Sequence, residues 1–236
     1  MPSIAENVRL VRDRIAALEA SHGRPAGRVS LLAVSKKHGP ERLREAYEAG
    51  QRAFGENYVQ EALDKMTALT NPADPEPLTD IVWHFIGPLQ SNKTREVTAH
   101  FGWVHSVDRL KIARRLSEQR PEDMPPLNVC VQVNISGEAS KSGVAPEEVE
   151  ALCETIAALP RLTLRGLMAI PAPAVDLQAQ RAVYRPLAEQ FRSLQRRHAT
   201  MDTLSIGMSG DLEAAIAEGG TMVRVGTALF GARNSK

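Results

Sequence analysis

The chain has 236 residues and a formal net charge of +1, with 29 Lys and Arg against 28 Asp and Glu. Hydrophobic residues make up 43% and charged residues 24%, which is typical of soluble globular proteins and is enough for a large core. Because the charges nearly balance, no strong field points to nucleic acid or to an anionic membrane, and neither is expected as a partner.

Two isolated cysteines, Cys130 and Cys153, both lie in apolar surroundings. Their number and spacing fit neither a disulfide framework nor a metal site, so we expect buried, reduced thiols and no metal. The N-terminus shows no basic segment followed by an apolar core, and no apolar run approaches membrane-spanning length. The expected compartment is therefore the cytoplasm.

The chain opens with helical periodicity over residues 4–21, where apolar residues recur at steps of three and four. From there short apolar runs alternate with amphipathic segments. The runs predicted as strands are 29–34, 52–55, 81–86, 103–107, 129–135, 162–170, 203–208 and 222–225. The helices predicted after them are 40–50, 58–69, one from Ser91, 108–118, one from Pro146, 176–198 with a distortion at Pro186, 214–217 and 227–230.

Regular alternation of strand and helix favours a parallel sheet with right-handed crossovers. Eight such units in about 200 residues is the count of a (β/α)8 barrel. We therefore predict an α/β protein with one TIM-type barrel domain over residues 1–236, with the extra N-terminal helix on its outside or bottom. The alternative is an open, doubly wound sheet.

The loops after the seventh and eighth strands carry the clearest site signal. Barrels often bind phosphate there, because small residues let backbone N–H groups approach an anion and a helix N-terminus favours it. Ser209-Gly210 and Gly226-Thr227 supply small residues and hydroxyls at these positions. Ordinary turn chemistry and helix capping explain the same residues, and spacing alone leaves both interpretations open.

Lys36 and Lys37 follow the first strand. Partial desolvation lowers the pKa of a lysine in such a place and frees its amine for Schiff-base formation. A solvated charge at the rim is the simpler interpretation, and it must hold for one of the two, because adjacent strand residues face opposite ways. A Schiff-base lysine facing a phosphate cradle is what a pyridoxal 5′-phosphate (PLP) site requires.

A series of short stretches, spread over nearly the whole chain, carries a resemblance to a known family. In chain order they are Leu31-Leu-Ala-Val-Ser-Lys-Lys, Phe54-Gly-Glu-Asn-Tyr-Val-Gln-Glu, Trp83-His-Phe-Ile-Gly-Pro-Leu-Gln-Ser-Asn-Lys, Val133-Asn-Ile-Ser, Ser140-Lys-Ser-Gly, Arg165-Gly-Leu-Met, Ser205-Ile-Gly-Met-Ser-Gly-Asp-Leu-Glu-Ala-Ala-Ile and Met222-Val-Arg-Val-Gly-Thr-Ala-Leu-Phe-Gly. On these stretches the chain resembles the YggS/PROSC family of pyridoxal phosphate homeostasis proteins. The resemblance implies the barrel of PLP fold type III, like the N-terminal domain of alanine racemase, without a C-terminal β domain.

The resemblance also implies roles for seven cofactor-binding residues. Lys36 holds PLP as a Schiff base; Ser209, Gly226 and Thr227 hold its phosphate. Arg224 stands beside the pyridine nitrogen, with Asn57 and Met168 near the ring. Met168 is equally well explained as plain core, and His84 is more simply a hydrogen-bonded core histidine. The departures from the family pattern are small: Gly210 stands where Ala or another small polar residue is expected, and Ile206 where Met is expected.

Alanine-racemase-like enzymes share this barrel and lysine, so a weak PLP-dependent amino-acid racemase is the alternative function. Racemisation needs a second base, which in the racemases is a tyrosine from an added β domain that we expect to be absent. Tyr47 and Tyr184 are predicted within helices away from the mouth, and only Tyr58 directly follows a strand. Arg224 can only donate hydrogen bonds, which favours an unprotonated pyridine nitrogen and a weaker electron sink. A barrel enzyme that binds another phosphorylated ligand is the second alternative.

We therefore predict a non-catalytic protein that carries or buffers PLP for intracellular vitamin B6 and amino-acid homeostasis. Its expected partners are PLP and apo forms of PLP-dependent enzymes, and the expected state is a monomer. Lys141 is a hypothetical second aldehyde site for transfer of the cofactor, although a solvated loop lysine is the simpler interpretation.

Overall fold

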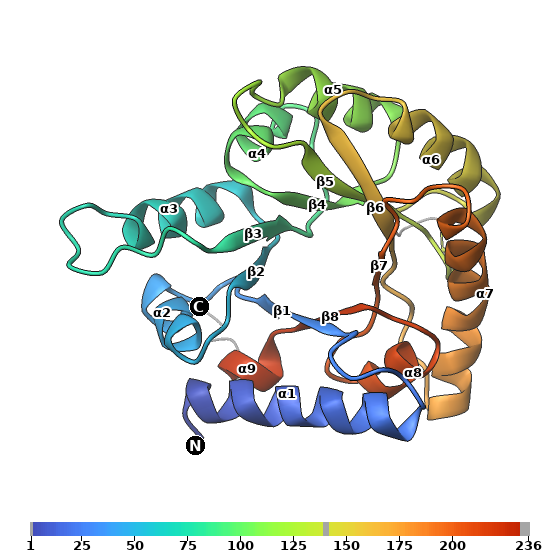
Figure 1. Cartoon of the computed structure of the whole chain (residues 1–236), viewed down its shortest axis with the longest axis horizontal. Coiled ribbons are helices and arrows are strands. Elements are labelled where there is room, and N and C mark those ends of the chain that lie inside the picture. Colours follow the sequence, from blue (N-terminus) through green and yellow to red (C-terminus); the bar gives the residue numbers. More distant parts are fainter. Residues whose placement is uncertain (1, 139–141, 232–236) are drawn as a thin grey trace.

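Parallel strands close into a barrel in the order β1 to β8 in the computed structural model, which describes residues 2–138 and 142–231 (Figure 1). The strands are β1 (Ser30–Val34), β2 (Ala53–Glu56), β3 (Val82–Phe85), β4 (Trp103–Val107), β5 (Leu127–Gln132), β6 (Leu162–Met168), β7 (Thr203–Ser205) and β8 (Met222–Val225). Strand β1 pairs in parallel with both β2 and β8, so the sheet has no free edge. This closure confirms the predicted barrel and excludes the open doubly wound sheet.

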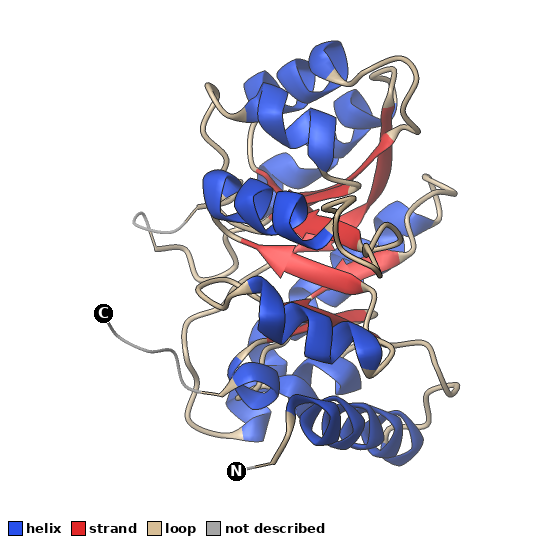
Figure 2. Cartoon of the chain, turned by 90° about the vertical axis from the view of Figure 1, so that its left-hand side faces the viewer, coloured by secondary structure: helices blue, strands red, loops and turns tan. Residues whose placement is uncertain are grey.

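Helices follow the strands and surround the barrel, as Figures 1 and 2 show. They are α1 (Ile4–Ser21), α2 (Pro40–Glu48), α3 (Val59–Leu69), α4 (Thr94–His100), α5 (Leu110–Gln119), α6 (Val149–Ala157), α7 (Leu177–Gln195), α8 (Leu212–Ala217) and α9 (Thr227–Phe230), with a 3-10 turn at Pro146–Glu148. The predicted elements are thus confirmed in order and type, with their ends shifted by a few residues.

The extra helix α1 lies on the outside of the barrel, as predicted. A capping box at Ser3 and Glu6 begins the helix, and its apolar positions face inward. It packs against α9, α8 and α2 (Figure 1). The side-chain amide of Asn7 donates to the carbonyl of Leu229 at 2.9 Å, which joins the first helix to the last. The residues after β8 are therefore held in place from the beginning of the chain.

Strand β5 ends earlier than predicted, whereas α7 is one helix with Pro186 inside it, as predicted. Strand β5 ends at Gln132 rather than near Ile135; the next residue, Val133, still donates to the Met168 carbonyl of β6 but forms an isolated bridge with Val144. Helix α7 runs through Pro186 as one element, with its first turn capped by the Asp176 carboxylate. The proline is thus accommodated within the helix.

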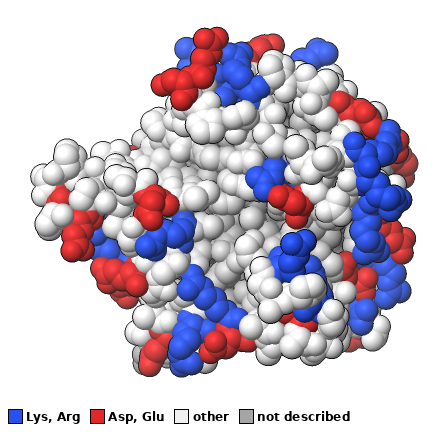
Figure 3. All heavy atoms as spheres, in the orientation of Figure 1, with Lys and Arg blue, Asp and Glu red and all other residues white. Residues whose placement is uncertain are grey.

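Charged side chains on the face shown in Figure 3 lie mostly around its periphery, while the centre of that face is largely uncharged. Both signs are interspersed, in keeping with the net charge of +1. Lys and Arg gather along the edge formed by α7. Across the described residues, no helix is both long and apolar enough to cross a membrane.

Candidate functional site

A cavity of about 240 Å³ opens at the carboxyl ends of the strands, where active sites of such barrels lie. The loops after β1, β2, β7 and β8 contribute most of its wall. The residues that line it are Val34, Lys36, Asn57, Ile86, Ile170, Met208, Ser209, Gly210, Arg224, Gly226 and Thr227. The structure therefore brings together six of the seven predicted cofactor-binding residues, which come from four separate stretches of the sequence.

Lys36 reaches this cavity because a tight turn follows β1. The backbone N–H of His38 donates to the carbonyl of Ser35 at 3.1 Å and closes the turn around the two lysines. Lys37 takes the left-handed conformation, with φ at 65°, and is exposed, whereas Lys36 is half-buried and lines the cavity. The structure thus distinguishes the two lysines as the sequence predicted, with Lys37 at the solvated rim.

A buried ion cluster supports the turn that carries Lys36. The ammonium of Lys65 donates to the carbonyl of Ser35 at 2.8 Å, to Glu56 at 2.7 Å and to Glu61 at 2.6 Å. The Ser35 hydroxyl donates to Glu56 at 2.6 Å, and the backbone N–H of Lys37 donates to Glu61 at 2.5 Å. The residues on both sides of Lys36 are therefore anchored. Burial raises the pKa of Glu56 even though Lys65 opposes the shift.

Small residues shape the opposite wall. Gly207 has φ at 91°, and a Cβ there would lie 2.5 Å from the Cβ of Ala215, so the position requires glycine. A Cβ on Gly226 would lie 3.0 Å from the carbonyl oxygen of Val34, so β8 passes close to β1 at the cavity. In contrast, a Cβ on Gly210 would meet no atom within 4 Å, which agrees with the small side chain expected there.

Arg224 forms the polar floor of the cavity. Its guanidinium donates to the Ser205 carbonyl at 2.5 Å, the Ser205 hydroxyl at 2.9 Å and the Ala169 carbonyl at 2.9 Å. The side chain is only 4% exposed, so burial lowers its pKa, but an arginine remains charged. These three contacts fix the guanidinium plane.

A chain of neutral groups continues from this floor into the barrel. The Ser205 hydroxyl lies 2.9 Å from Nδ1 of His105, and His105 Nε2 lies 2.9 Å from Nδ1 of His84. Each of these two bonds needs one donor and one acceptor, so both imidazoles carry their proton on the same kind of nitrogen, either both on Nε2 or both on Nδ1. Burial lowers the pKa of His84 to about 3 and that of His105 well below its ordinary value. His84 is thus a hydrogen-bonded core residue and does not line the cavity.

Met168 is the one predicted cofactor-binding residue that does not line the cavity. It is fully buried in a cluster with Trp103 and Cys130, as the plain-core interpretation has it. Lys141, the hypothetical second aldehyde site, lies outside the described residues. Both cysteines are buried free thiols, as predicted.

The tyrosines fall into three environments. Tyr47 donates to Asp80 at 2.5 Å, just before β3 and away from the cavity, whereas Tyr58 is exposed and lines a neighbouring cavity. Tyr184 corrects the sequence prediction: its helix lies outside the barrel, but its hydroxyl donates to Asp211, directly after the Ser209-Gly210 turn, at 2.7 Å. The sequence placed Tyr184 within a helix and away from the mouth, and helical periodicity could not show that its hydroxyl reaches the loop after β7.

The cavity fits a ligand that joins an aldehyde to a phosphate. Half-buried Lys36 provides an amine on one side, and Ser209, Gly226 and Thr227 provide hydroxyls and small residues on the other. Asn57 carries a buried side-chain oxygen that has no hydrogen-bond partner within the described chain, so a polar group of a ligand could satisfy it. Arg224 offers a charged donor at the floor.

Two kinds of sequence relative match almost the whole chain. The family described as the alanine racemase N-terminal domain matches residues 3–234. A protein of Pseudomonas aeruginosa named pyridoxal phosphate homeostasis protein is 58% identical over 99% of this chain and 97% of its own length. A protein of the same name from Escherichia coli strain K12 is 53% identical over 99% of this chain and 98% of its own length.

Solved structures agree with the fold. PipY of Synechococcus elongatus PCC7942, solved with PLP bound, is 39% identical and superposes with a TM-score of 0.78 over 92% of this chain and 100% of its own. Alanine racemase from Corynebacterium glutamicum, at 17% identity, shares the fold with a TM-score of 0.69 over 98% of this chain and 61% of its own.

Proposed function

The chain belongs to the family of pyridoxal phosphate homeostasis proteins, which is built on the alanine racemase N-terminal domain, and we propose that it binds PLP in the cavity at the barrel mouth. Its function is to carry or buffer the cofactor for vitamin B6 homeostasis rather than to turn over amino acids. Two relatives named for PLP homeostasis and the PLP-bound PipY structure support this proposal.

The observation that carries the proposal is the arrangement of six predicted residues around one cavity. We propose that Lys36 attaches the cofactor by condensing its amine with the aldehyde, with loss of water. Ser209, Gly226 and Thr227 bind the phosphate. Arg224 donates a hydrogen bond to the pyridine nitrogen from the floor of the cavity. When bound, PLP would supply a ring that can accept electrons.

Two residues act on the cofactor's surroundings in this proposal. The unpartnered oxygen of Asn57 accepts a hydrogen bond from the ligand's ring substituents. Met168 acts indirectly, because it precedes Ala169, whose carbonyl holds Arg224. The expected metal-free, monomeric state, the cytoplasmic location and the apo-enzyme partners belong to the same proposal.

The environment of the tyrosines favours a carrier over a racemase. A second base opposite Lys36 must have an accessible group that accepts a proton. Burial and Asp211 raise the pKa of Tyr184, and its hydroxyl already donates to that carboxylate. His84 and His105 are buried within the barrel and hydrogen-bonded to each other. Tyr58 is exposed and lines a separate cavity.

The absorption spectrum of the PLP-treated protein tests the binding proposal. We expect a near-visible band that disappears on borohydride reduction, is missing in Lys36→Ala and persists in Lys37→Ala, the matched control. A protein that stays colourless with added PLP would contradict the proposal and favour a barrel enzyme for another phosphorylated ligand.

The carrier role has a separate test. Incubation of the loaded protein with L-alanine or L-serine is expected to leave the optical rotation unchanged. Efficient loss of optical rotation that depends on Lys36 would replace the carrier with a PLP-dependent racemase.

A further inference from the structure

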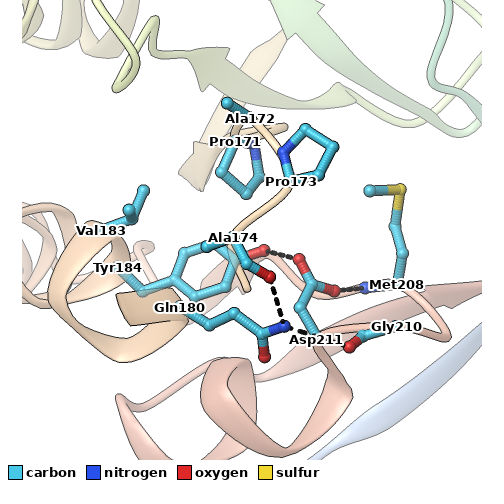
Figure 4. Close-up of a pocket in the computed structure, with 10 residues that line it drawn as sticks. All are labelled: Pro171, Ala172, Pro173, Ala174, Gln180, Val183, Tyr184, Met208, Gly210 and Asp211. Atoms are coloured by element: carbon cyan, nitrogen blue, oxygen red, sulfur yellow. Dashed lines mark hydrogen bonds between the residues drawn. The ribbon is translucent and has the colours of Figure 1, made fainter. Parts of the chain in front are cut away.

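Asp211 ties together the loop after β7 by two hydrogen bonds to different partners (Figure 4). One carboxylate oxygen accepts from the Met208 backbone N–H at 2.6 Å, and the other accepts from the Tyr184 hydroxyl at 2.7 Å. The Asp211 backbone N–H donates back to the Met208 carbonyl at 3.2 Å. The chain from Met208 to Asp211 is therefore a closed turn, fastened from outside by one tyrosine.

The residues inside this turn are those that face the cofactor cavity. Met208, Ser209 and Gly210 all line it. Within the described chain, no hydrogen bond occupies the backbone N–H of Ser209 or of Gly210. These donors are available to an anion, and their direction depends on the shape that Asp211 gives to the turn.

The tyrosine itself is held rigidly by α7. Its side chain is fully buried, and burial together with the Asp211 charge raises the pKa of the phenol, so the hydroxyl remains a donor. One turn earlier on the same helix, the Gln180 amide lies 3.4 Å from the Gly210 carbonyl and 3.3 Å from the Ala174 carbonyl (Figure 4). The outer helix α7 thus holds the turn at two points.

A second cavity, of about 300 Å³, lies beside this link. Tyr184, Gln180 and Asp211 line it, together with Met208 and Gly210, which also line the cofactor cavity. The Met208–Gly210 turn therefore separates two cavities and lines both of them. Met208 and Gly210 are both exposed, so the hydrogen bonds of Asp211 are an important restraint on the turn.

We propose that Tyr184 is a positioning residue that acts through Asp211 to hold the Met208–Gly210 turn in the shape that receives the cofactor's phosphate. This inference rests on the proposed function, because it assumes that the phosphate binds at Ser209. It assigns the selectivity for phosphorylated over unphosphorylated pyridoxal to a residue that does not touch the cofactor.

The test compares the affinities of PLP and pyridoxal for wild type and Tyr184→Phe. The variant keeps the buried ring and removes only the hydroxyl, so we expect it to bind PLP about tenfold more weakly, as for loss of a hydrogen bond to a charged group, and to bind pyridoxal unchanged. A merely structural role would weaken both ligands alike. Tyr47→Phe is the matched control, because Tyr47 makes the same kind of bond, to Asp80, at the other end of the barrel.

Hydrogen exchange of the Met208 amide gives a second measurement that needs no cofactor. We expect faster exchange in Tyr184→Phe and in Asp211→Asn than in wild type or Tyr47→Phe. An unchanged ratio of PLP to pyridoxal affinity, or an unchanged Met208 amide, would overturn the positioning role. If wild type bound neither aldehyde, the proposed function would fail, and the Met208 amide would still decide whether Tyr184 holds the turn.

Discussion

The two walls of the cavity are held in place by opposite means. The wall that carries Lys36 rests on a buried ion cluster, in which one ammonium and two carboxylates bind the residues before and after the lysine. The wall formed by Ser209, Gly226 and Thr227 rests on close backbone approach and on hydrogen bonds from α7.

The difference follows from what each wall is proposed to bind. Carboxylates near an amine would ordinarily pair with it and keep it protonated. Here Glu56 and Glu61 both accept from Lys65, so one ammonium within the cluster compensates part of its two negative charges. An anion on the other wall needs N–H groups that it can approach, and small residues provide them. Breaking each wall should therefore have a distinct signature.

Removal of the buried ammonium is expected to have the largest effect. Lys65→Met leaves the fully buried Glu56 without its counterion, and loss of one partner of a buried pair costs about 3–5 kcal/mol in the free energy of unfolding. Urea denaturation measures the loss. Lys111→Met, the same change at an exposed lysine of α5, serves as the control.

The double variant Lys65→Met/Glu56→Gln sharpens this prediction. Since it removes both charges, we expect it to recover a substantial part of the lost stability. Equal losses for Lys65→Met and Lys111→Met would show that the cluster does not support the lysine-bearing wall.

Addition of one methyl group at Gly207 should distort the wall opposite Lys36. Gly207→Ala places a Cβ against Ala215 in a backbone conformation that favours glycine, and we expect a loss of about 1–3 kcal/mol in unfolding free energy together with weaker PLP binding. Gly210→Ala, three residues later in the same loop, is the control, because its Cβ meets open space. Similar stabilities for the two variants would argue against close approach as the support of this wall.

The buried histidines behind the floor of the cavity predict a smaller, pH-dependent effect on the free energy of unfolding. The pKa of His84 is about 3 in the folded protein, against an ordinary value of 6.5, so the unfolded state binds the extra proton between these values. Stability is therefore lost as the pH falls below 6.5, by about 1.4 kcal/mol at pH 5.5 from this group. The buried His105 shifts in the same direction.

Urea denaturation between pH 7.5 and pH 5.5 checks this effect. His84→Gln should show a shallower loss of stability over this range than wild type, while His100→Gln, at the end of α4, should keep the wild-type slope. Equal slopes for all three proteins would mean that His84 is not held neutral in the folded state.

The sequence predicted most of the fold and of the site for identifiable physical reasons. Alternating strands and helices gave the barrel, and the rule that sites lie at the carboxyl ends of strands led to Lys36, Ser209 and Gly226. The left-handed Lys37 is also consistent with only one lysine facing inward. These features depend on local order along the chain, which a sequence displays directly.

The supports of the site were not predictable in the same way. The Lys65 cluster joins β1, β2 and α3, and the Tyr184–Asp211 bond spans 27 residues. Lys65 lies in a helix where an exposed side chain is the ordinary expectation, yet it is only 4% exposed. Apart from the Glu61–Lys65 pair, which has the i,i+4 spacing of a helix, such contacts depend on how elements pack around the barrel. Met168 is the opposite case: it lies in a stretch that matches the family, yet its side chain is buried in the core and does not line the cavity.

The most direct test of the central claim is a peptide mass map of the PLP-treated protein after borohydride reduction. We predict a pyridoxyl phosphate group on Lys36 and an unmodified Lys37, because Lys36 lines the cavity whereas Lys37 is exposed at the rim. A modification on Lys37 or on any other lysine in place of Lys36, or none at saturating PLP, would contradict the assignment of this cavity as the cofactor site.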